Sequence, residues 1–133
     1  MQEALEYVDK NLDASIEDLK VLCSIPSVSA ENRGIKEASV KVMGIMKDAG
    51  IDSRILRLDD ANPLVYGEYK PESYEKTIIF YNHYDVQPAD PLELWKSPPF
   101  EPAVRDNKIF ARGVADNKGN IIARIKAVES ILR

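Results

Sequence analysis

The sequence predicts an α/β protein in which helices pack on one mixed β-sheet. Two amphipathic helical patterns open the chain, three short strand patterns follow, and another helical pattern closes it. A length of 133 residues is enough for one domain with one hydrophobic core. No linker or internal repeat divides the chain, so we expect residues 1–133 to belong to a single domain.

Apolar residues recur at steps of three and four from the N-terminus, and this spacing predicts one long helix over residues 2–24. Pro26 ends this helix, because the residue before a proline avoids the helical conformation. The single cysteine, Cys23, lies on the helix and has no partner in the chain. We expect it to be a small core residue of a protein in a reducing compartment.

A polar loop is expected over residues 27–34, and a second helical stripe follows it from residue 38 to residue 49. Gly50 stands where a helix commonly ends. Residues 51–58 partly alternate between apolar and polar, and residues 64–69 form another short β-type run. Both segments are predicted to be strands.

The third strand is predicted at residues 77–81, the most apolar run of the chain, and should lie centrally with both faces covered. Five prolines predict little regular structure over residues 84–104, and a short strand is expected at residues 108–111. The last helical pattern, residues 121–132, reaches Arg133 without a terminating Gly, Asn or Pro. We therefore expect the chain to be a truncated piece of a longer protein.

Charge and hydropathy exclude several classes of partner. The formal net charge is −4, and the basic residues are scattered among acidic ones. Without a basic stripe to neutralise phosphates, binding to nucleic acid is not expected. No apolar run approaches the roughly 20 residues that a membrane span needs, and the acidic N-terminus does not resemble a signal peptide. We expect a cytoplasmic protein with no membrane partner.

His83 is the only histidine, and Asp85 follows it by two residues. A lone histidine near the end of a strand is more often a hydrogen-bonded residue than a ligand. Neutral imidazole is nevertheless a good zinc ligand, and its second nitrogen usually needs an acceptor. Residues two apart on a strand point to the same side, so Asp85 could be that acceptor.

A second acidic motif, Asp-Asn-Lys-Gly, begins at Asp116, 33 residues after the histidine. Asp116 suits an ordinary helix N-cap, while Gly113 and Gly119 permit the close backbone approach typical of a site. A calcium loop is excluded because Lys118 occupies a position that requires an oxygen ligand. A phosphate loop is excluded because the four-residue gap before Gly-Lys is missing. The chain also lacks the Gly-x-Ser-x-Gly motif of a serine nucleophile.

Three ordered motifs resemble the zinc aminoacylase/carboxypeptidase metallopeptidase family, which includes acetylornithine deacetylase, succinyl-diaminopimelate desuccinylase and carnosinase-type dipeptidases. The motifs are HYDVQP (83–88), WKSPPFEP (95–102) and IFARGVADNKG (109–119). A fourth segment, LCSIPSVS (22–29), is similar to the first helix and following loop of that family. The resemblance spans nearly the whole chain, and its VQP and WKSPPF parts favour the dipeptidase branch.

The resemblance implies a two-zinc site, in which cobalt or manganese could replace zinc. His83 would ligate one ion, Asp116 would bridge both, and Asp85 would assist catalysis by orienting His83. Two such metals lower the pKa of a shared water and polarise the scissile carbonyl. The resemblance also implies a cis peptide bond between Asp116 and Asn117. The parent enzyme would cleave amide bonds of dipeptides or N-acyl amino acids.

The family's remaining site residues have no counterpart in the chain. These are a Glu-Glu pair that contains the general base, a further carboxylate and a second histidine. Glu129 is too close to Asp116 on the same helix to be that base. The lid or dimerisation domain is also absent.

We therefore expect residues 1–133 to be the N-terminal portion of the zinc-peptidase catalytic domain of a homodimeric parent. The piece alone should be inactive and should self-associate through the open edge or bare face of its incomplete sheet. The alternative function is a non-catalytic binding or oligomerisation module that keeps the fold.

Overall fold

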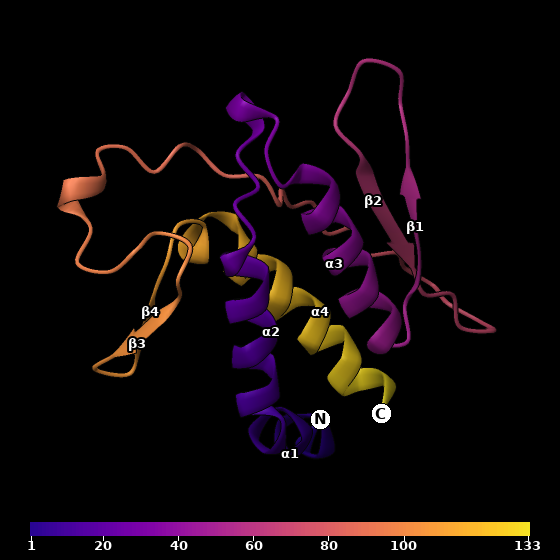
Figure 1. The fold of residues 1–133 in the computed structure, drawn as a ribbon. Coiled ribbons are helices and arrows are strands. Elements are labelled where there is room, and N and C mark those ends of the chain that lie inside the picture. The colour runs from indigo at the N-terminus through magenta and orange to yellow at the C-terminus, as the bar shows by residue number, and fades with distance from the viewer.

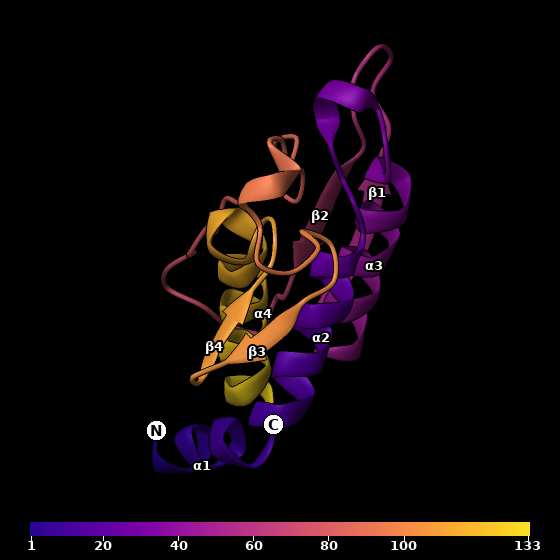
Figure 2. The same cartoon turned by 60° about the vertical axis from the view of Figure 1, so that its left-hand side comes forward.

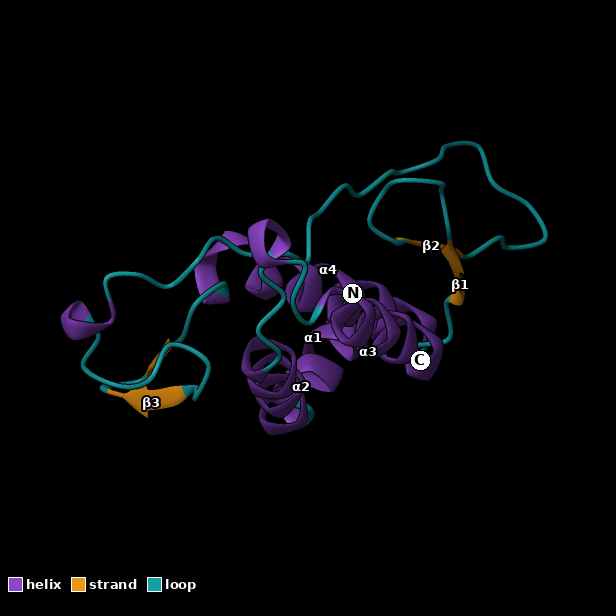
Figure 3. Cartoon of the chain, turned by 45° about the horizontal axis from the view of Figure 1, so that its top comes forward, coloured by secondary structure: helices purple, strands orange, loops and turns teal.

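Four α-helices and two short β-hairpins form the protein. The structure is a computed structural model that describes residues 1–133. In chain order the elements are α1 (Gln2–Lys10), α2 (Leu12–Ser24), the 3-10 turn η1 (Ser29–Glu31), α3 (Ile35–Asp48), β1 (Asp52–Leu56), β2 (Leu64–Glu68), the 3-10 turn η2 (Leu92–Leu94), β3 (Ala103–Arg105), β4 (Lys108–Phe110), the distorted turn η3 (Val114–Lys118) and α4 (Gly119–Leu132). The β1–β2 hairpin lies beside α3, and the β3–β4 hairpin lies on the opposite side of the helices (Figures 1 and 2). Figure 3 shows the helices in the centre, with long loops extending outwards.

The hydrophobic core lies mainly between α2, α3 and α4, where their apolar stripes meet. It consists of ten buried residues: Leu22, Ile25, Ala38, Val42, Ile45, Ala49, Ile51, Ile121, Ile122 and Ile125. Cys23 is also fully buried and unpaired, which confirms its prediction as a core residue. The core holds α4 against α2, and α4 begins directly after the segment that carries Asp116.

The predicted helix over residues 2–24 is two helices, α1 and α2, which meet at Asn11. The Asn11 side chain donates a hydrogen bond to the carbonyl oxygen of Tyr7 at 2.8 Å, and its backbone N–H donates to the carbonyls of Tyr7 and Val8, so Asn11 binds the end of α1. No residue of α1 is buried, because the helix leaves the core. The apolar spacing continues across the break, and this is why periodicity alone predicts one helix.

The predicted central strand at residues 77–81 is wrong for this chain. These residues form no strand, and Ile78 and Ile79 are 77% and 87% exposed. A strand forms by pairing with a neighbour, and residues 77–81 make no backbone–backbone hydrogen bond in the structure. Their apolar composition is suited to a buried sheet whose neighbouring strands these 133 residues do not supply.

The α/β class is confirmed, but the strands form two separate antiparallel hairpins, β1–β2 and β3–β4, instead of one mixed sheet. The predictions of α3, α4, β1, β2 and β4 are confirmed with small differences in their ends. Gly50 follows α3 with φ of 81°, in the left-handed region that glycine favours. Apart from η2 and the start of β3, the proline-rich segment is irregular, as predicted. None of the helices has the length and apolar character needed to cross a membrane.

The exposed run at residues 77–81 should drive self-association, because unpaired apolar strands associate edge to edge. We expect the protein to form concentration-dependent oligomers in sedimentation velocity. Ile79→Lys should shift the population towards monomer by adding charge to this run. Val40→Lys is the matched control, because Val40 is also an exposed apolar residue, at 55%, but lies on α3. A monomeric wild-type protein at high concentration, or an equal effect of both variants, would contradict this account.

Candidate metal site

His83 and Asp116, 33 residues apart in the sequence, are in direct contact. The Nε2 atom of His83 lies 2.9 Å from Oδ1 of Asp116. His83 comes from the loop that follows residues 77–81, and Asp116 comes from η3, before α4. Their side chains are 42% and 84% exposed, so both polar groups are open to solvent.

Asp85 lies on the other side of the imidazole. The Nδ1 atom of His83 is 3.1 Å from the carbonyl oxygen of Asp85 and 3.3 Å from its Oδ1 atom. Both ring nitrogens therefore face oxygen acceptors. Partial burial lowers the pKa of His83. The hydrogen bonds to the Asp85 carbonyl and to Asp116, together with the charges of both carboxylates, have a larger effect and raise the pKa above its usual value. A metal ion at Nε2 would compete with protonation of this ring.

Asp116 does not act as a helix N-cap. Its φ of −132° and ψ of 95° interrupt the turn η3, and no side chain caps α4. The carboxylate points to His83 instead. The peptide bond between Asp116 and Asn117 is cis, which confirms that expectation from the resemblance.

The two segments that carry His83 and Asp116 are both attached to residues 22–28, which we call the anchor segment. The buried Lys118 donates from Nζ to the carbonyl oxygens of Leu22, at 3.0 Å, and Ile25, at 2.7 Å. Ser27 donates from Oγ to the carbonyl of Tyr84 at 2.7 Å. The Ser27 carbonyl in turn accepts from the backbone N–H of Val86 at 2.8 Å.

The sequence motifs do not predict Lys118 as a site residue, although the sequence contains a signal for it. It precedes Ile121, Ile122 and Ile125 at the spacing of one buried helical face. A lysine in such a stripe must find polar partners inside the protein. Burial lowers the pKa of Lys118 to about 8, although the interactions with Cys23 and Asp85 act in the opposite direction.

Gly113 and Gly119 allow the close approach that the sequence predicts. Gly113 has φ of 85°, and a Cβ atom there would lie 2.6 Å from Cγ1 of Val86. A Cβ at Gly119 would lie 2.2 Å from the backbone oxygen of Val114. Larger residues at either position would push the turn before α4 away from its neighbours.

The donors present fit part of a metal site. An imidazole nitrogen and a carboxylate oxygen are ordinary zinc ligands, and the Asp85 carbonyl and carboxylate hold the second ring nitrogen as such ligands require. No group of three or more His, Cys, Asp or Glu side chains is placed to hold a metal ion. Glu129 is not a further donor, because it binds Tyr7 and Lys126 through its carboxylate and is nearly buried.

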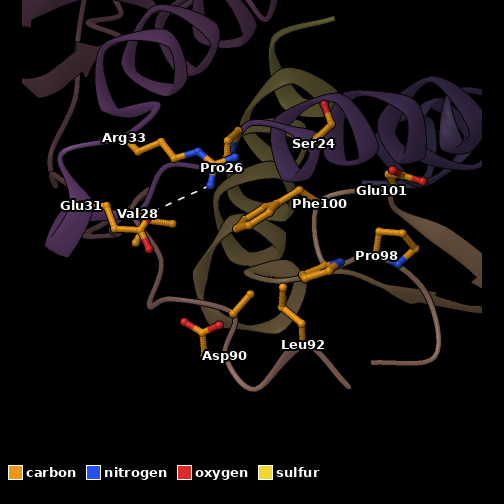
Figure 4. A pocket seen from close by; sticks show the side chains of 12 residues that line it. Ser24, Pro26, Val28, Glu31, Arg33, Asp90, Leu92, Pro98, Phe100 and Glu101 are labelled. Carbon is orange, nitrogen blue, oxygen red and sulfur yellow. Dashed lines mark ion pairs between the residues drawn. The ribbon is translucent and has the colours of Figure 1, made fainter. Parts of the chain in front are cut away.

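One pocket of the protein is separate from this site. It has a volume of about 440 Å³ and is bounded by the anchor segment, the loop around η1 and the proline-rich loop (Figure 4). Phe100 and Pro26 line it, and Glu31 and Arg33 form an ion pair at 3.8 Å on its rim. None of His83, Asp85 and Asp116 lines it.

Comparisons with known proteins agree on one family. The model of the family "Peptidase family M20/M25/M40" matches residues 79–133, a range that contains His83, Asp85 and Asp116. The Cys-Gly metallodipeptidase dug1 of Schizosaccharomyces pombe is 34% identical over 98% of this chain and 30% of its own length. The succinyl-diaminopimelate desuccinylase of Delftia acidovorans is 38% identical over 84% of the chain and 29% of its own length.

A solved structure has the same fold. The M20 family metallo-carboxypeptidase of Sulfolobus solfataricus superposes with a TM-score of 0.84 and 34% identity, over 89% of this chain and 27% of its own. The chain thus spans less than a third of the length of these relatives.

Replacing Gly113 tests the close packing beside the site. Gly113→Ala should lower the free energy of unfolding by about 1–3 kcal/mol, because the new Cβ meets Val86 and the backbone is left-handed. The control is Gly44→Ala on α3, where a Cβ would meet nothing within 4 Å. That change should raise the free energy of unfolding by roughly 0.5–1 kcal/mol, because glycine is a poor helix former. Urea denaturation measures both, and a neutral Gly113→Ala variant would show that the turn is not tightly packed.

Proposed function

The chain belongs to peptidase family M20/M25/M40, and from this premise we propose that it supplies His83 and Asp116 to the metal site of an amide-bond hydrolase. The observation that carries the proposal is the 2.9 Å contact between His83 and Asp116, with Asp85 behind the imidazole. All three residues lie in the part of the chain that matches the family model. The reaction of the whole protein is part of the proposal, since the chain spans about 30% of its relatives' length.

Each of the three residues has a chemical role in this proposal. His83 would bind a divalent ion, for which zinc is the proposed identity, through Nε2, the ring nitrogen that faces Asp116. Asp116 would offer its carboxylate, which is 84% exposed, as a ligand to the same ion or to a second one. Asp85 holds Nδ1, and this fixes the tautomer and the direction of the free nitrogen. When bound, such ions polarise a carbonyl oxygen and lower the pKa of a coordinated water.

The proposed substrates are dipeptides or N-acyl amino acids. The relatives are called a metallodipeptidase, a desuccinylase and a metallo-carboxypeptidase, and all three names describe cleavage of an amide bond. We propose that the whole protein acts as a homodimer. A cytoplasmic location is part of the proposal, since the unpaired Cys23 suits a reducing compartment.

A zinc titration tests the metal site directly. Because His83 is the only histidine, its ring signals in an NMR spectrum are unambiguous. We expect Zn²⁺ to shift these signals with weak affinity, because two protein donors are fewer than the usual three or four. Asp116→Asn should weaken binding, while Asp9→Asn, which removes an exposed carboxylate from α1, should not. The protein of 133 residues should show no amide hydrolysis.

Other outcomes of the titration favour a different function. Zinc that leaves the His83 signals unchanged, or that binds equally well to the Asp116→Asn variant, would contradict the proposed site. The protein would then be better described as a binding or oligomerisation module that keeps the fold, consistent with its exposed apolar run at residues 77–81. Tight binding of two zinc ions to the monomer would also contradict the view that the chain holds only part of the site.

A further inference from the structure

We propose that Lys118 is a positioning residue, which aligns Asp116 with His83 by fastening the turn before α4 to the anchor segment. The ammonium group of Lys118 binds the carbonyl oxygens of Leu22 and Ile25, and the residue is fully buried. Leu22 lies in the last turn of α2, where carbonyl groups lack partners within the helix. Both oxygens also accept a backbone N–H, that of Leu22 from Ile25 at 3.4 Å and that of Ile25 from Ser27 at 2.8 Å, and the lysine adds a buried charged donor to each.

Lys118, whose ammonium group binds the anchor segment, is close to Asp116 in the sequence. Lys118 follows Asp116 by two residues, and its backbone N–H donates to the carbonyl of Gly113 at 2.9 Å. This bond closes the turn that contains Asp116. The stem of Lys118 also packs beside Gly113, since a Cβ there would lie 3.2 Å from Cδ of Lys118. Fixing the end of the side chain thus restricts the turn from which the Asp116 carboxylate projects.

The opposite end of the anchor segment holds the histidine. Ser27 binds the carbonyl of Tyr84 through Oγ and the N–H of Val86 through its own carbonyl oxygen. Tyr84 and Val86 flank Asp85, and Tyr84 follows His83 directly. Ile25 and Ser27 are separated by one residue, Pro26, so the two attachments share one short piece of backbone.

The contact between His83 and Asp116 cannot replace these attachments. Both side chains are substantially exposed, and exposed ion pairs are weak. The bonds of Lys118 are buried and join a charged donor to two acceptors, which makes them the stronger constraint. The two candidate ligands should therefore meet because their segments are held by the anchor segment.

The test compares two lysines that both join α4 or its start to α2. Lys118→Met removes the ammonium group and keeps an apolar stem beside Gly113. Lys126→Met is the matched control, because Lys126 binds Asp18 of α2 at 2.9 Å and Glu129 at 3.0 Å. Lys126 lies more than two helical turns after Asp116 and contacts neither site residue. Both variants should unfold at lower urea concentrations than the wild type.

The discriminating measurement is the NMR spectrum of the single histidine without metal, with Asp116→Ala as the reference for a lost contact. In Lys118→Met the His83 ring signals should move at least halfway from the wild-type positions to those of Asp116→Ala. In Lys126→Met they should stay at the wild-type positions. A folded Lys118→Met variant with unshifted His83 signals would overturn the proposal, because Lys118 would then stabilise the fold without positioning the site.

A second pair of variants tests the positioning role of the anchor segment if Lys118→Met does not fold. Ser27→Ala removes one bond at the other end of the anchor segment, and it should shift the His83 signals in the same direction. Ser39→Ala is its control, because Ser39 is an equally buried serine that binds a carbonyl within α3. Unshifted signals in Ser27→Ala would overturn the proposal. The inference rests on the proposed function, because it treats His83 and Asp116 as one site. The spectra are recorded without metal, so a failure of this inference is distinguishable from a failure of the protein to bind zinc.

Discussion

A buried ammonium group that is bonded to carbonyl oxygens holds the Asp116 half of this site against the same backbone segment that binds the His83 half. Burying a charge is costly unless the charge is hydrogen-bonded, and Lys118 is bonded to Leu22 and Ile25. A hydrogen bond to a charged group contributes about 1.5–3 kcal/mol. The exposed pair of His83 and Asp116 contributes about 0–1 kcal/mol by comparison. The site therefore depends on the buried bonds much more than on its own contact.

The hydrophobic core gives this arrangement its rigidity. Leu22 and Ile25 belong to the same buried cluster as Ile121 and Ile122 of α4. Leu22 and Ile25 bind Lys118 through their carbonyl groups, and their side chains belong to the same cluster as those of α4, the helix that follows Lys118. Packing and hydrogen bonding specify the same position for the start of α4, and the absence of a side chain at Gly113 lets the loop around Val86 come close. The polar groups of the candidate site lie at the surface of this packed unit.

The sequence predicts those parts of the fold whose patterns are satisfied within the chain. The apolar stripes of α3 and α4 are buried in the core, so their periodicity predicts both helices correctly. Residues 77–81 are apolar enough for a buried strand, but no strand of this chain pairs with them. The helix over residues 2–24 is interrupted because the side chain of Asn11 binds the end of α1. Composition and periodicity indicate the environment in which a segment would be stable. For residues 77–81 that environment is a sheet, and no strand of this chain pairs with them.

The candidate site is predicted from motifs and resemblance, because spacing along the chain does not bring residues 83 and 116 together. The motifs give Lys118 no role in the site, and the signal for that role is its place in the buried stripe of α4. The central claim, that His83 and Asp116 form part of one metal site, is tested most directly by anomalous diffraction from crystals soaked in Zn²⁺. The account predicts a zinc peak about 2.0–2.2 Å from Nε2 of His83 and from a carboxylate oxygen of Asp116. Zinc bound only at other side chains, with His83 and Asp116 both free of it, would contradict the account.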